Sequence, residues 1–176
     1  MATELQFIKS QSVTDGVTSQ DITDIFSAKY DVYAITFSTG SNSTTALDVR
    51  ARFIDSGGSV LSTSNYDYAY QTMRTDTSFS EGRATNQTYL NTLFGTTDQN
   101  PEGATGIVYV FNPFNSSYTF VTQQSMNTYS SLELGRKYIG VLTETTSCTG
   151  INAFVTASAF GSNTKFSVYG VKWVVH

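Results

Sequence analysis

Residues 46–55 read ALDVRARFID, and apolar and polar side chains alternate along this segment. Successive side chains of a β-strand point to opposite faces of its sheet, so the alternation predicts a strand with one buried and one solvated face. The preceding segment YDVYAITFS (30–38) predicts a second strand of the same kind. The apolar parities are Leu47, Val49, Ala51 and Phe53 in the first segment and Tyr33, Ile35 and Phe37 in the second.

Short strand-like segments recur along most of the chain, and turn residues separate them. They are residues 3–9, 59–63, 106–113, 116–127, 136–143, 150–160 and 163–175. The stretch DSGGSV (55–60) supplies Gly57 and Gly58 for the positive φ angles of a hairpin turn. About eight to ten such strands predict a single all-β domain over residues 1–176, built as an antiparallel β-sandwich or jelly roll.

Two segments depart from this pattern. SQDITDIFSAKY (19–30) places Ile22, Ile25 and Phe26 at helical spacing, and we expect at most one short helical turn there. Residues 76–106 are rich in Gly, Asn, Asp and Thr, and they predict a long loop-rich segment with one short strand. A loop of that length is usually functional or wraps a neighbouring molecule.

Composition narrows the function classes. Ser and Thr make up 49 of the 176 residues, charged residues are 14%, aromatic residues are 14%, and the formal net charge is −4. A nucleic-acid surface needs a stripe of Lys and Arg, which is absent from the sequence, so DNA and RNA are not expected partners. No segment reads as a signal peptide or a membrane-spanning helix, and the single cysteine, Cys148, fits a reducing cytosol.

The sequence offers little for catalysis. A Ser-His-Asp triad needs an imidazole, and the only histidine is the last residue, His176. Transition-metal sites want several His or Cys ligands. Asp98, Asn100 and Glu102 could ligate calcium, but turns use these residue types more often to cap the backbone. We therefore expect no enzyme, no cofactor and no metal, and no pair of carboxylates stands in a recognisable glycosidase setting.

The candidate contact residues are aromatic. In SNYDYAYQTM (64–73), Tyr66, Tyr68 and Tyr70 alternate and project from one face of a strand. Such a ladder is core or subunit interface when it is covered, and it can stack on sugar rings when it is exposed. Trp173, on the two-sided apolar segment 163–175, is the fourth candidate for an interface or glycan contact.

Three passages together carry a family resemblance: SNYDYAYQTM (64–73), GIVYVFNPFNSSYTFVTQQS (106–125) and TGINAFVTASAFGSNTKFSVYGV (149–171). In this order they resemble small virion structural proteins of tailed bacteriophages, especially marine and cyanobacterial phages. The resemblance spans residues from about 20 to 171 and implies a β-sandwich or jelly roll on the outside of the particle. It implies no catalytic residues.

The function expected from this resemblance is that of a non-catalytic virion surface structural protein, either a capsid decoration subunit or a tail-appendage subunit. It would be made in the bacterial host cytoplasm, and its partners would be other capsid or tail proteins and further copies of itself. A trimer would suit either location. The alternative is a carbohydrate-binding adhesin of a tail fibre, which recognises a host-surface glycan.

Overall fold

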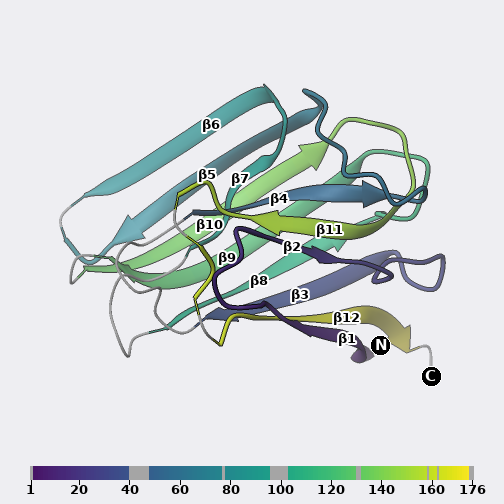
Figure 1. The fold of residues 1–176 in the computed structure, drawn as a ribbon, viewed down its shortest axis with the longest axis horizontal. Coiled ribbons are helices and arrows are strands. Elements are labelled where there is room, and N and C mark those ends of the chain that lie inside the picture. The colour runs from purple at the N-terminus through teal and green to yellow at the C-terminus, as the bar shows by residue number, and fades with distance from the viewer. Residues whose placement is uncertain are drawn as a thin grey trace.

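The computed structural model describes residues 2–39, 48–76, 78–95, 103–129, 132–157, 159–161 and 163–174. The described residues form twelve strands in two antiparallel sheets that pack face to face, with the smaller sheet lying over the larger (Figure 1). This confirms the all-β antiparallel sandwich, with more strands than the eight to ten expected. The described residues contain no helix that is long and apolar enough to cross a membrane.

The larger sheet has eight strands and the smaller has four. In spatial order, the larger sheet holds β1 (Ala2–Ser12), β12 (Lys165–Val174), β3 (Val32–Thr39), β8 (Ala104–Phe111), β9 (Thr119–Tyr129), β10 (Leu132–Leu142), β5 (Tyr66–Arg74) and β6 (Phe79–Gln87). The smaller sheet holds β2 (Ser19–Ile22), β11 (Cys148–Phe154), β4 (Asp48–Asp55) and β7 (Leu90–Gly95).

The core lies between the two sheets, and the predicted alternation supplies it. Tyr33, Ile35 and Phe37 of β3 are buried against the smaller sheet. Phe37 packs on Phe94 of β7 and on Phe166 of β12, with ring centroids 4.8 and 5.1 Å apart. Each fully buried side chain of this size contributes roughly 1.5–3 kcal/mol to stability.

The helical turn expected in residues 19–30 does not form. Residues 19–22 are the edge strand β2, in which Ile22 lies opposite Ile151 of β11. The N–H groups of Ile25 and Phe26 both donate to the carbonyl of Thr149, at 2.9 and 3.2 Å. The three apolar side chains are buried as expected, but the backbone bonds to β11 instead of to itself.

The segment 76–106 is more regular than expected. It contributes β6 and β7 as well as the start of β8, so its described part holds two complete strands and not one. β6 pairs with β5, and β7 pairs with β4 through an irregularity between Val49 and Ala51. The calcium candidates Asp98, Asn100 and Glu102 lie outside the described residues, as does His176.

The hairpin expectations are confirmed for residues 106–127 and only in part for 55–63. β8 and β9 pair antiparallel after a turn in which Asn112 has φ 55°. In the DSGGSV turn Gly58 has φ 83°, but residues 59–63 form only the isolated bridge between Ile54 and Val60. The segment expected as a strand at 150–160 ends at Phe154 and belongs to the smaller sheet.

Candidate functional site

The larger sheet has an outer face that the smaller sheet does not cover. Along β9, Val121, Gln123 and Ser125 point inward and are buried, whereas alternate residues point outward. Two of these outward side chains are large and apolar: Phe120 is 49% exposed and Met126 is 61% exposed. Ile139 of the neighbouring β10 is also 61% exposed. Large apolar side chains therefore face solvent in the middle of the sheet.

The strand register arranges this outer face in rows that cross β8, β9, β10 and β5. One row is Phe111, Phe120, Val141 and Asp67, and the next is Tyr109, Thr122, Ile139 and Ala69. A third, more polar row is Ile107, Gln124, Lys137 and Gln71, and a fourth is Thr105, Met126, Gly135 and Met73. Apolar rows therefore lie on both sides of one polar row.

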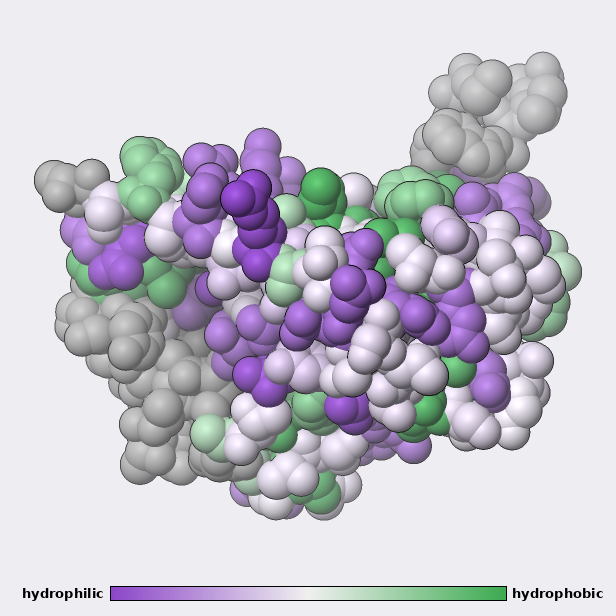
Figure 2. Space-filling view, turned by 90° about the horizontal axis from the view of Figure 1, so that it is seen from above, coloured by the Kyte–Doolittle hydropathy of each residue, from purple (hydrophilic) through white to green (hydrophobic). Residues whose placement is uncertain are grey.

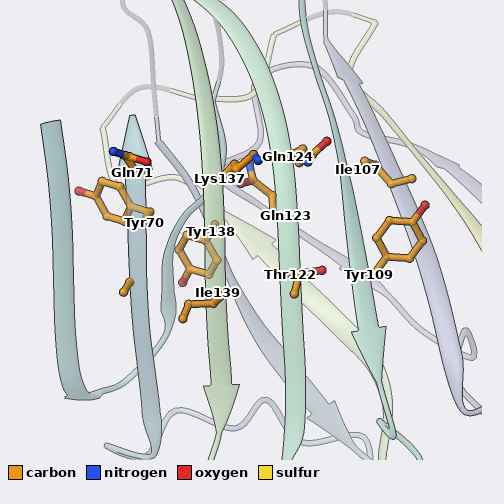
Figure 3. A pocket seen from close by; sticks show the side chains of 11 residues that line it. Tyr70, Gln71, Ile107, Tyr109, Thr122, Gln123, Gln124, Lys137, Tyr138 and Ile139 are labelled. Carbon is orange, nitrogen blue, oxygen red and sulfur yellow. The ribbon is translucent and has the colours of Figure 1, made fainter. Parts of the chain in front are cut away.

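Three shallow grooves lie side by side on the outer face. The first has a volume of about 500 Å³; Ile107 and Tyr109 border it on β8 and Gln71 on β5, with side chains of β9 and β10 between them (Figure 3). The second, about 790 Å³, includes Phe111, Phe120, Ile139 and Val141. The third, about 560 Å³, includes Met73, Met126, Ile107 and Gln124.

The surface seen from above the view of Figure 1 is less apolar than the outer face. It is a mosaic of hydrophilic and weakly polar side chains with small, separate apolar spots (Figure 2). Single apolar residues on a surface are ordinary, whereas contiguous apolar patches mark contact sites. The outer face of the larger sheet is therefore the surface that needs a functional explanation.

The candidate tyrosines point away from the outer face. Tyr66 is fully buried: its hydroxyl donates to the carbonyl of Leu61 and accepts from the N–H of Phe53, both at 2.9 Å. It is a core residue and not a contact residue. Tyr68 and Tyr70 are half-buried and stack on Tyr138 of β10, with ring centroids 5.8 and 6.2 Å away.

Trp173 belongs to β12, where its backbone lies opposite Thr3 of β1. Its side chain is outside the part of the chain that the structure describes. The structure therefore brings Tyr66, Tyr68 and Tyr70 together on one inward face and does not place Trp173 with them.

A partly buried arginine lies beside the tyrosine stack. The guanidinium of Arg136 is 5.2 Å from the ring centroid of Tyr70, and its Nη1 is 3.5 Å from the carboxylate of Asp48. Burial lowers the pKa of Arg136, and the charge of Asp48 opposes this shift. Burial raises the pKa of Tyr138, whose hydroxyl has no hydrogen-bond partner among the described residues. Arg136, Asp48 and the tyrosine hydroxyls therefore form a polar cluster between the two sheets.

The described residues contain no group of three or more His, Cys, Asp or Glu side chains that could hold a metal ion. Cys148 is buried, and burial raises the pKa of its thiol to about 12. Because the thiolate is the nucleophilic form, this cysteine is held in its unreactive state.

Sequence reasoning identified Phe120 and Met126 as strand residues but not as members of a contact surface. The available signal lay in β8, where Ile107, Tyr109 and Phe111 occupy the parity opposite the buried Val108 and Val110. Apolar side chains on both parities indicate a strand whose two faces are both covered, one by the core and the other by a further contact. That signal points to the outer face.

Comparison with known proteins adds no relatives: no protein-family model matches the chain, and no curated protein sequence matches it.

Proposed function

We propose that this protein is a non-catalytic structural protein of a tailed-bacteriophage particle, a capsid decoration or tail-appendage subunit, and that it acts through protein–protein contacts made by the outer face of its larger sheet. Two lines of reasoning support the proposal. The first is the resemblance of residues from about 20 to 171 to such virion proteins. The second is the uncovered apolar surface of the sheet.

The exposed apolar side chains of the outer face are the observation that carries the proposal. Phe120, Met126 and Ile139 are each about half exposed or more, and they lie on adjacent strands. Covering a half-exposed side chain of this size is worth roughly 1 kcal/mol. Monomeric proteins rarely expose contiguous apolar patches beyond a few hundred Å² unless these bind something. A protein partner or a further copy of the chain would gain from covering this face.

The charges around the outer face fit a protein contact and not a highly charged ligand. Lys137 lies in the polar row, and at the β5–β6 edge Arg83 is accompanied by Asp67 and Glu81. Both signs are therefore present, with Lys137 between the apolar rows and the other charges at the β5–β6 edge. Apolar side chains interspersed with charges of both signs are common in protein–protein interfaces, which are only about as apolar as the rest of a protein surface.

The experiment compares the full-length protein with Ile139→Lys, which places a charge in the centre of the outer face. Ser62→Lys, at an exposed loop position that lines none of the three grooves, adds the same charge as a control. Solution mass by light scattering and co-sedimentation with purified heads and tails of the encoding phage are measured. We expect the wild type and Ser62→Lys to oligomerise or to co-sediment, and Ile139→Lys to do so at least about tenfold more weakly. A wild type that stays monomeric and binds neither heads nor tails contradicts the proposal.

The second candidate function is a carbohydrate-binding adhesin, and the groove in Figure 3 is the observation that favours it. There Tyr109 and Ile107 are accompanied by Gln71, Thr122 and Gln124, whose amide and hydroxyl groups suit sugar hydroxyls (Figure 3). Tyr109→Ala then abolishes binding of the free protein to host cells, while Tyr118→Ala, at an exposed tyrosine that does not line this groove, leaves it unchanged. If both variants bind cells as the wild type does, the adhesin function is excluded.

A further inference from the structure

The smaller sheet carries a separate cluster of arginines and aromatic rings on its solvent side. Val49, Ala51 and Phe53 of β4 face the core, so Arg50 and Arg52 project from the opposite face. The register places Arg50 opposite Phe154 and Arg52 opposite Asn152 on β11. Tyr89, just before β7, completes the cluster and packs edge-on against Phe154 with ring centroids 5.7 Å apart.

Ring stacking and hydrogen bonds fix the two guanidinium groups. The guanidinium of Arg50 is 4.7 Å from the ring centroid of Tyr89, and that of Arg52 is 4.4 Å from the centroid of Phe154. Each Nε has its own acceptor: Arg50 donates to the side-chain oxygen of Asn91 at 2.9 Å, and Arg52 donates to the carbonyl of Thr88 at 3.0 Å. With Nε engaged and the plane resting on a ring, each group offers its Nη donors to an incoming ligand.

The tyrosine ladder supports this cluster from behind. The hydroxyl of Tyr68 interacts with the side chain of Asn91, which is the same amide that holds Arg50. One chain of contacts therefore runs from the larger sheet through Tyr68 and Asn91 to the arginine pair. Preorganised donors of this kind lose less conformational entropy when they bind.

The pair has no carboxylate partner among the described residues. Among the described residues, ion pairs join Arg74 to Asp76 and Arg136 to Asp48, and neither involves Arg50 or Arg52. In the row that crosses the sheet from Arg52, Asn152 of β11 comes next and then Asp21 of β2, which accepts a hydrogen bond from Asn152 at 2.6 Å. Residues two apart on a strand are roughly 7 Å apart, so two like charges stand close together. Asp48, two residues before Arg50 on β4, pairs with Arg136 and not with Arg50.

We infer that Arg50 and Arg52 form a binding site for the carboxylate groups of an acidic polysaccharide. Guanidinium groups pair with carboxylates through two parallel hydrogen bonds, and two neighbouring groups match a polymer that repeats its carboxylates. Hydrogen-bonding side chains surround the pair, with Asn152 and Ser19 on one side and Asn91 on the other, and these suit sugar hydroxyls.

The position of the pair on the solvent side of the smaller sheet, where both arginines are half-buried, favours a repeating polymer over a small molecule. None of the three grooves described above includes Arg50 or Arg52. An open surface gives one isolated anion little binding energy, whereas a polymer that engages many copies of the protein binds by avidity. Nucleic acid is disfavoured because two arginines neutralise few phosphates and the chain carries a net charge of −4. The site lies on the other sheet from the outer face and does not depend on the function proposed above.

The test is affinity electrophoresis of the full-length protein through gels that contain polygalacturonate, neutral dextran or duplex DNA. The variant is Arg50→Gln with Arg52→Gln. Its control is Lys29→Gln with Lys172→Gln, which removes two exposed positive charges elsewhere and changes the net charge equally. We expect polygalacturonate, but not dextran, to retard the wild type and the lysine variant at low salt. The arginine variant should bind at least about tenfold more weakly, because charge-assisted hydrogen bonds are lost.

Asp21→Asn keeps the test decisive if the arginine variant fails to fold. This substitution retains an oxygen that can accept from Asn152 and removes the negative charge in the cross-strand row of Arg52, so binding of polygalacturonate should strengthen about twofold at low salt. The inference is overturned if the wild type is not retarded, if both double variants lose retardation equally, if DNA retards the wild type more strongly, or if Asp21→Asn leaves binding unchanged. Retained binding of polygalacturonate by the Arg50→Gln, Arg52→Gln variant would also overturn the inference, because the guanidinium groups would then not be the binding groups.

Discussion

Two buried tyrosines on the inward face of the larger sheet should respond in opposite ways to the same substitution. Tyr66 and Tyr138 are both almost completely buried. The hydroxyl of Tyr66 bonds to two backbone groups of the neighbouring sheet and loop, the N–H of Phe53 and the carbonyl of Leu61. The hydroxyl of Tyr138 has no partner among the described residues. Replacing each tyrosine with phenylalanine removes one oxygen atom and leaves the ring in place.

The magnitude follows from what each oxygen satisfies. In Tyr66→Phe, two buried backbone groups lose a partner, and an unsatisfied buried group costs about 1–3 kcal/mol. We expect a loss of about 3 kcal/mol in the free energy of unfolding, or about 6–12 °C in Tm for a chain of this size. In Tyr138→Phe no hydrogen bond among the described residues is lost, and the substitution removes a buried hydroxyl that has no partner. Its stability should stay within about 1 kcal/mol of the wild type or increase.

Urea unfolding at pH 7, followed by circular dichroism, measures both variants against the wild type. The slope of free energy against urea should be the same in all three proteins, because the surface exposed on unfolding does not change. The reasoning is refuted if Tyr138→Phe loses as much stability as Tyr66→Phe, or if Tyr66→Phe loses less than about 1 kcal/mol.

Three further predictions concern the same core. Gly170→Ala places a Cβ 2.4 Å from the ring of Tyr30, so thermal unfolding should show a loss of about 1–3 kcal/mol; an unchanged Tm would contradict the packing. Cys148 should react with a thiol reagent at pH 8 only as fast as the protein unfolds, because burial raises its pKa to about 12; fast labelling of the native protein would show that the thiol is accessible. Burial also raises the pKa values of Tyr66 and Tyr138, so these groups ionise first in the unfolded chain. Stability should be constant up to about pH 8 and fall above about pH 10, by up to about 1.4 kcal/mol per pH unit for each group, as a series of urea unfolding curves can measure.

The faces of individual strands could be predicted from sequence because one-sided burial leaves a period of two. Residues 46–55 and 30–38 show it plainly, and their apolar parities are the ones that the structure buries, within the described residues. Which sheet each strand joins is a different matter. β3 and β4 follow one another in the chain but belong to different sheets, and β10 and β11 do so as well. Strand partners are set by long-range packing, which leaves no local signal.

Local propensity misled in two segments, one whose backbone partners are distant in the sequence and one that forms a polar edge strand. Ile22, Ile25 and Phe26 have helical spacing and are all buried in the core, but their backbone partners are distant in the sequence. Ile22 pairs with Ile151, and the N–H groups of Ile25 and Phe26 donate to the carbonyl of Thr149. β6 has few apolar side chains because it is the last strand of the larger sheet and has a partner on one edge only. A polar edge strand reads like a loop in the sequence.

The alternating tyrosines Tyr66, Tyr68 and Tyr70 show how much of a candidate site a two-residue period can predict. Alternation correctly placed Tyr66, Tyr68 and Tyr70 on one face, but it could not say which face or how well covered it is. How well each tyrosine is covered depends on how far the four-stranded sheet extends over the eight-stranded sheet. β7 is the last strand of the smaller sheet, and it reaches β5 but leaves β6 beyond its edge. Tyr66 therefore lies under the smaller sheet and is fully buried, whereas Tyr68 and Tyr70 lie near its margin and are half-buried. The same mismatch explains how Tyr68 can touch Asn91 at the edge of the smaller sheet and so join the arginine pair to the core.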